Sequence, residues 1–120
     1  MYHSFKDMPV WKKAIELAVE VFHLTKYLPI SENYGLTSQV RRSANSVTAN
    51  IAEAFGRKTN KDKSSFYTIA KGSAYETQSH LIYGEKVGYF SAEKVNLINE
   101  QYSALNHDIN KIFKTLNAKP

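Results

Sequence analysis

The chain contains no cysteine, only three prolines and only five glycines among its 120 residues. Without cysteine, the sequence holds neither a disulfide framework nor a thiolate metal site. The few prolines and glycines leave no low-complexity linker, and a hydrophobic content of 42% argues against disorder. We therefore expect residues 1–120 to form a single domain, long enough to bury a core without covalent staples.

Long apolar runs are also missing. No stretch approaches the roughly 20 apolar residues of a membrane span. The beginning of the chain, MYHSFKDMPVWKK, lacks the uninterrupted apolar segment of a signal peptide. We expect a cytoplasmic protein with no membrane partner.

What the sequence does contain is helical periodicity. Apolar residues recur at spacings of three and four in four ranges, about 8–28, 37–56, 61–88 and 92–117. Pro29 is expected to stop the first helix, and Gly56 to end the second in a left-handed conformation. Short connections between long helices predict an all-α fold, an antiparallel up-down-up-down four-helix bundle.

Two glycines interrupt the third range. Gly72 and Gly84 each lower helix stability by about 1 kcal/mol relative to alanine. Glycine at such positions indicates that another helix backbone approaches closely.

The second range carries two parallel patterns. Its apolar stripe is Val40, Ala44, Val47, Ile51 and Ala54. Beside it runs a polar seam consisting of Gln39, Ser43, Ser46, Asn50, Glu53 and Arg57. This polar seam either forms a hydrogen-bonded network that fixes the register of helices or subunits, or lines a binding groove. We favour the first interpretation, because buried polar residues in bundles most often specify packing.

The sequence around the polar seam resembles a known family. The motifs are Arg41-Arg42, Asn50-Ile51-Ala52-Glu53, Phe55-Gly56-Arg57, Gly72-Ser73 and Tyr75-Glu76. They are similar to the bacterial four-helix-bundle proteins encoded by intervening sequences in 23S ribosomal RNA genes. The chain departs from the family pattern at Ala54, where glycine is usual, and at Thr48, where proline is frequent.

The resemblance implies a small helical bundle that assembles into a ring, a homopentamer. A similar protein, the accessory protein of diversity-generating retroelements, is a basic pentameric barrel that binds nucleic acid and a reverse transcriptase. For the intervening-sequence proteins themselves, the resemblance implies no settled biochemical activity.

Cations gather around the polar seam, in a chain of net charge +5. Two arginines lie on the second helix and four cations lie around its end: Arg41, Arg42, Arg57, Lys58, Lys61 and Lys63. Flexible lysines and bidentate guanidinium groups suit phosphate contacts with RNA or DNA. The alternative is a set of solvated surface charges, with one helix arginine paired to Glu76 or Glu53.

Apolar side chains outside the predicted core suggest assembly. The chain has eight tyrosines, and a four-helix monomer buries one face per helix. The residues expected at an oligomer interface are Trp11, Phe22, Tyr67, Tyr75 and Ile82. The alternative is a wide core with tyrosine hydroxyl groups at its rim.

Candidate catalytic and metal groups are sparse. Glu20 and His23 have the Glu-x-x-His spacing of di-iron bundles, but the second such pair and the further glutamates are missing. No serine lies in a nucleophile motif, and no glycine-rich phosphate loop is present. We predict a non-enzymatic protein without cofactor. Its function is either that of a homo-oligomeric nucleic-acid-binding or ribonucleoprotein accessory protein, or that of a protein–protein scaffold.

Overall fold

The computed structural model describes residues 2–118 as four long helices, and this part of the chain contains no strand. The helices are α1 (Pro9–Leu24), α2 (Leu36–Gly56), α3 (Asn60–Lys86) and α4 (Ala92–Asn117). Two short 3-10 helices, η1 (Phe5–Asp7) and η2 (Ile30–Glu32), precede α1 and α2. The predicted all-α four-helix bundle is confirmed.

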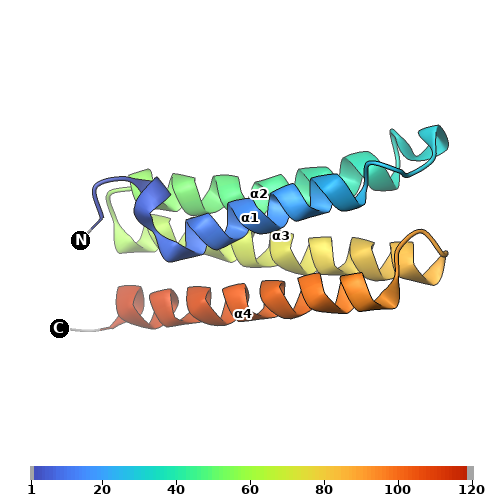
Figure 1. Ribbon diagram of the computed structural model, residues 1–120. Helices are drawn as coiled ribbons and strands as arrows, with labels where there is room; N and C mark the ends of the chain where they lie inside the picture. The colour runs from blue at the N-terminus through green and yellow to red at the C-terminus, as the bar shows by residue number, and fades with distance from the viewer. Residues whose placement is uncertain (1, 119–120) are drawn as a thin grey trace.

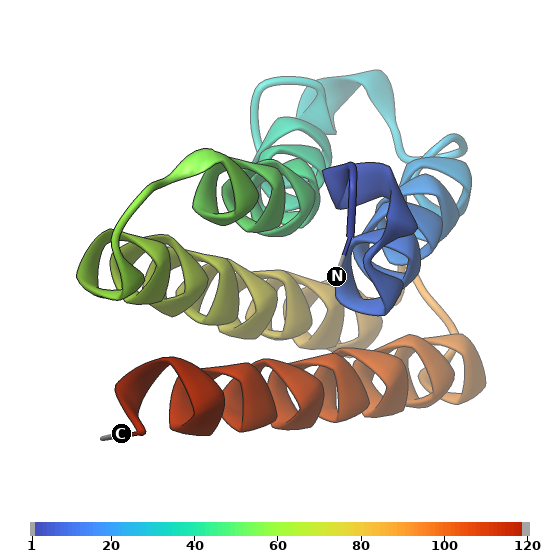
Figure 2. The same cartoon turned by 90° about the vertical axis from the view of Figure 1, so that its left-hand side faces the viewer.

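The helices run alternately up and down along a rod of 51 × 22 × 20 Å (Figure 1). The two ends of the chain emerge at the same end of this rod. Among neighbouring helices, packing is most extensive between α2 and α3 and least extensive between α1 and α4. Within the described residues, no Cα atom of α1 lies within 8 Å of one of α3, because these helices lie on opposite corners of the bundle (Figure 2).

The core consists of the apolar stripes that the sequence predicts. The apolar stripe of α2 is fully buried, and equivalent stripes of α1, α3 and α4 meet it. The buried apolar residues of α1 and α4 are Val10, Ala14, Leu17 and Val21, and Val95, Ile98, Tyr102, Leu105 and Ile109. Spacing of three and four residues thus places one face of each helix in a common interior.

The first helix ends earlier than predicted, at Leu24 rather than near Leu28. The hydroxyl of Thr25 lies 2.9 Å from the carbonyl oxygen of Val21 and 3.0 Å from that of Phe22. This buried threonine satisfies carbonyl groups of the last helical turn, so the chain turns before it reaches Pro29.

The glycines act differently from expectation. Gly56 is the last residue of α2, and among the described residues only Gly88 has a positive φ, of 90°. At Gly84, a Cβ atom would overlap the ring of Phe90, so a side chain, not a helix backbone, comes close. At Gly72, a Cβ atom would meet nothing within 4 Å. The expectation of a close helix backbone is wrong at both positions within the subunit.

Candidate nucleic-acid interface

Arg41, a predicted phosphate contact, joins two helices of the subunit. Its Nε donates to the hydroxyl of Thr25 at 2.8 Å, and its Nη2 donates to the carbonyl oxygen of Phe22 at 3.4 Å. Its guanidinium also lies 4.3 Å from the centre of the Phe22 ring. These contacts place the positive charge at the C-terminal end of α1, where the helix dipole favours a cation.

Arg42 is paired as the alternative interpretation predicts. Its Nη2 donates to the Glu76 carboxylate on α3 and to the side-chain oxygen of Gln39. His80 lies 3.2 Å from the same Glu76 oxygen. The Arg42 and Glu76 side chains are 58% and 39% exposed, so water screens this pair.

The centre of the polar seam packs against α3. The hydroxyl groups of Ser43 and Thr77 lie 2.8 Å apart, and so do those of Ser46 and Ser73. Asn50 donates to the backbone carbonyl of Ser46 at 2.8 Å. The polar seam therefore includes a hydrogen-bonded network between helices, which is the interpretation favoured from sequence. Such bonds fix the register of α2 against α3.

Beyond the seam, the cluster after α2 divides into engaged and unengaged cations. Arg57 pairs with Glu53 at 3.0 Å and lies 4.5 Å from the centre of the Phe66 ring. Lys63 donates to the carbonyl oxygens of Ala54 and Phe55, both at 3.1 Å, and so caps the C-terminal end of α2.

Lys58 and Lys61 differ from these two. Both are exposed, and neither has a salt-bridge or side-chain hydrogen-bond partner within residues 2–118. They are the two predicted phosphate contacts whose ammonium groups are available to a ligand.

The tertiary structure gathers more positive charge around these two lysines. The basic end is the half of the bundle made of residues 2–16, 47–73 and 106–118. It carries ten lysines and arginines against five carboxylates. The opposite half, residues 17–46 and 74–105, carries five against six and is the aromatic end. The whole positive excess of the described residues therefore lies at the basic end.

The reasoning from sequence missed several members of the basic end. Lys6 and Lys12 come from η1 and α1, while Lys111 and Lys114 lie in the last turns of α4. Asn60, at the start of α3, donates to the carbonyl oxygen of Leu116 at 3.2 Å, which brings α4 beside the α2–α3 connection. The antiparallel topology was the only signal in the sequence that joins these distant segments.

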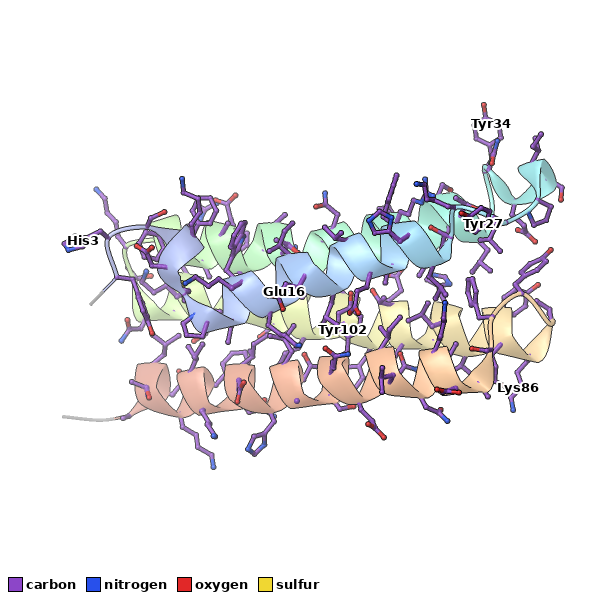
Figure 3. All side chains as sticks on the ribbon, viewed as in Figure 1. His3, Glu16, Tyr27, Tyr34, Lys86 and Tyr102 are labelled. Atoms are coloured by element: carbon purple, nitrogen blue, oxygen red, sulfur yellow. The ribbon has the colours of Figure 1, made fainter. Side chains whose placement is uncertain are left out.

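Figure 3 shows what distinguishes the aromatic end. Tyr27 and Tyr34 lie there, beyond the end of α1, and Tyr34 points away from the helices. Their side chains are 92% and 97% exposed. Other exposed residues at this end are Phe22, Tyr75, Ile82, Tyr83 and Tyr89.

The five predicted interface residues have different surroundings. Tyr75 and Ile82 are exposed on α3, and Phe22 is partly covered by Arg41. Trp11 is half-buried against Phe5, with 5.1 Å between ring centres. Tyr67 is only 3% exposed and packs against Phe113. The expectation that the core of one subunit leaves Tyr67 uncovered is therefore wrong.

Tyr102 is a buried phenol at the centre of the bundle (Figure 3). Burial raises its pKa far above the usual value, the negative charge of Glu20 adds to the rise, and Thr77 opposes it. Tyr102 is therefore neutral at physiological pH. In the described part of the chain, no group of three or more histidines and carboxylates is arranged to hold a metal ion. Glu20 and His23 line a surface hollow together with Lys94.

None of the helices in the described part of the chain has the length and apolar character required to cross a membrane.

Comparison with known proteins identifies the family. A protein of unknown function from the S23 ribosomal protein family of Bacteroides thetaiotaomicron VPI-5482 has a similar crystal structure, with a TM-score of 0.80. It is 29% identical, and the match covers 88% of this chain and 98% of that one. No curated protein matches the chain. The family model described as 23S rRNA-intervening sequence protein matches residues 6–117. With this match and the four-helix fold, the chain belongs to the 23S rRNA-intervening sequence protein family.

Proposed function

We propose that this protein is a non-enzymatic, cytoplasmic homo-oligomer, a pentameric ring, that binds nucleic acid through its basic end as a ribonucleoprotein accessory protein. The observation that carries this proposal is the segregation of charge, with the positive excess at one end of the bundle. Phosphate backbones attract such a surface whatever their base sequence. The ring itself is proposed from the resemblance to the pentameric retroelement accessory protein.

The binding is electrostatic and independent of base sequence. Lys58 and Lys61 are exposed on the α2–α3 connection and the first turn of α3, and Lys111 and Lys114 lie near the C-terminal end of α4. A ring repeats this group of lysines by symmetry, so several weak phosphate contacts act together on one long nucleic acid.

A fluorescence-anisotropy titration with labelled single-stranded RNA and double-stranded DNA tests this function. Binding is expected at 50 mM salt and weakens steeply as salt rises, because each neutralised phosphate releases a counterion. Absence of binding at low salt, or affinity that does not change with salt, overturns the proposal.

A pair of matched variants locates the surface. The double variant Lys58→Gln/Lys61→Gln removes two cations from the basic end and is expected to reduce the salt slope by about two per subunit engaged. The control Lys26→Gln/Lys86→Gln removes two exposed cations from the aromatic end and keeps the affinity of the parent protein. An equal loss of affinity in both double variants means that the net charge of the protein, and not the position of the basic end, determines binding.

A protein–protein scaffold is the second candidate. It is favoured by the contacts of Arg41, Arg42, Arg57 and Lys63, four of the six cations predicted to bind phosphate. All four are engaged within the subunit. For a scaffold, reversing the charges of Lys58 and Lys61 leaves both the oligomer and its binding to protein partners unchanged, and the nucleic-acid titration shows no binding.

A further inference from the structure

The solvent-facing side of α3 lacks charge. Eight residues between Ser65 and Tyr83 are largely exposed, and we call them the α3 stripe. They are three hydroxyl residues, one glycine, two isoleucines and two tyrosines: Ser65, Thr68, Ser79, Gly72, Ile69, Ile82, Tyr75 and Tyr83. The outward side of a surface helix normally carries charged residues, which keep it in water. Over five turns the largely exposed residues carry no charge, while the partly exposed Lys71 and Glu76 at the margin are engaged with Phe113 and Arg42. This pattern indicates a surface that another molecule covers.

The centre of the α3 stripe is shaped for a close contact. Ile69, Tyr75 and Ile82 are 49%, 60% and 45% exposed. Between Ile69 and Tyr75 lies Gly72, around which the subunit leaves open space. Glycine disfavours a helix interior, and no neighbour within the subunit requires it at this position. A gap between large side chains allows an element of another molecule to approach the α3 backbone.

A complementary surface lies along α1 and α4, the pair of helices with the least extensive packing. Two hollows of about 330 and 460 Å³ follow each other along this pair and share Glu20. Their apolar lining comes from Ile15, Val19, Leu24, Leu97 and Ile98. We call these two hollows the α1–α4 groove. Val19 and Leu97 are 47% and 59% exposed at its rim.

The polar groups of the two surfaces are also complementary. Glu20 forms no ion pair within residues 2–118 and lines both hollows, with Lys94 in the first and Glu16 in the second. Hydroxyl groups such as those of Tyr75 and Ser79 on the α3 stripe are hydrogen-bond donors for such a carboxylate. The stripe has no carboxylate of its own that would repel it.

We infer that the α3 stripe of one copy docks into the α1–α4 groove of the next copy. This inference rests on the homo-oligomer of the proposed function and specifies its contact surfaces. Because α3 lies diagonally across the bundle from α1, one subunit can use both surfaces at the same time. Contact between two different surfaces is heterologous, and its repetition closes into a ring when the rotation between neighbours allows.

Two single variants, each defective in one surface, test this arrangement. Tyr75→Lys places a charge in the α3 stripe, and Leu97→Lys places one at the rim of the α1–α4 groove. Each variant alone is expected to be monomeric by size-exclusion chromatography with light scattering. Mixed in equal amounts, they are expected to form a dimer of one copy of each, because one intact stripe then meets one intact groove.

Three other outcomes overturn the inference. Monomeric Tyr75→Lys with fully assembled Leu97→Lys shows that the α3 stripe contacts a surface other than the α1–α4 groove. Assembly of both single variants shows that other surfaces hold the oligomer. Two monomeric variants that remain monomeric on mixing show that the stripe and the groove are not each other's partners. Asn110→Lys, a charge at an exposed position outside both surfaces, is the control and keeps the mass of the parent protein.

Measurements on the parent protein separate this inference from the proposed function. Circular dichroism spectra like that of the parent show that the variants are folded. If the parent protein is itself a monomer by light scattering, the homo-oligomer fails together with the inference. If the parent is an oligomer that binds nucleic acid but the mixed variants do not pair, only the inference about these two surfaces fails.

Discussion

The two ends of the bundle are fastened in different ways. At the aromatic end, specific side-chain contacts hold the connections: Arg41 on Thr25, Phe90 against Gly84, and Glu32 on the backbone N–H of Leu36. At the basic end, α2 and α3 are joined by residues 57–59 alone.

The connections also differ in length. Three residues leave the connection at the basic end little freedom, and Thr59 and Lys63 hold the helix ends on either side of it. The connections of the aromatic end are longer, at residues 25–35 and 87–91, and recruit nearby polar groups. Beside the short connection, Lys58 and Lys61 remain available to a ligand while Lys63 is engaged, and Arg41 beside a long connection is engaged as well.

The largest change in stability is expected from a variant that disturbs the packing of the aromatic end. Gly84→Ala places a methyl group against the buried Phe90 ring and is expected to lower the free energy of unfolding by about 2 kcal/mol. The ring has little room to move away, because the backbone N–H of Phe90 lies 3.3 Å from the Gly84 carbonyl oxygen. Urea denaturation measures the change.

Gly72→Ala is the matched control for Gly84→Ala. Its methyl group meets open space, so better helix propensity is expected to raise the free energy of unfolding of the isolated subunit by about 0.5–1 kcal/mol. Equal changes in the two variants contradict the assigned role of Phe90.

The second prediction removes the contact between α1 and α2. Arg41→Ala is expected to lower the free energy of unfolding by about 1–2 kcal/mol, because the hydrogen bond to Thr25 and the stacking on Phe22 are lost. Arg42→Ala removes only exposed contacts, the ion pair with Glu76 and the hydrogen bond to Gln39, and is expected to cost about 0.5 kcal/mol or less. Thermal unfolding compares the two, and a larger loss for Arg42→Ala contradicts this assignment.

The third prediction distinguishes the cations of the basic end from each other. Lys63→Met keeps the apolar stem but removes the donor that caps α2, with an expected loss in unfolding free energy of about 0.5–1 kcal/mol. Lys58→Met removes an unpaired surface cation and is expected to stay within about 0.5 kcal/mol of the parent. Identical stabilities for these variants in chemical denaturation exclude the capping role of Lys63.

The smallest expected effect concerns pH at the aromatic end. The backbone N–H of Leu36 and then the Tyr89 hydroxyl lower the pKa of Glu32 below its ordinary value of 4.5. The stabilisation by this carboxylate is therefore fully present above pH 4.5 and disappears as the pH falls through the lower value in the folded protein. Unfolding free energies of the parent and Glu32→Gln are expected to converge at acidic pH. A difference that is constant with pH contradicts the prediction.

Much of the fold was predictable from the sequence because the apolar face of a helix depends on residues only three or four positions apart. The spacing of Val40, Ala44, Val47 and Ile51 determines a buried face whatever the neighbouring helix is. The end of α1 was not predictable, because Thr25 stops the helix with help from Arg41, sixteen residues away. Reasoning from sequence relied on Pro29, the visible helix breaker, and so extended the helix by one turn.

The candidate site was predictable only in part. Lys58 and Lys61 stood out by their position in a short basic connection, and the pairing of Arg42 with Glu76 was anticipated as one of two alternatives. Tyr67 was misjudged because helical spacing does not tell how wide a face the neighbouring helices cover. Tyr67 reaches Phe113 on α4, and only the packed bundle shows that α4 covers it.

The sequence by itself determined the helices, their apolar faces and the total charge, because these depend on residue types and on spacings of a few residues. Only the tertiary structure decided which cations are engaged and at which end of the bundle the positive charge accumulates. Electrostatic and hydrogen-bonding partners are chosen by distance in space. Antiparallel packing brings three regions together: η1 with the beginning of α1, the α2–α3 connection, and the end of α4. These three regions are far apart along the chain.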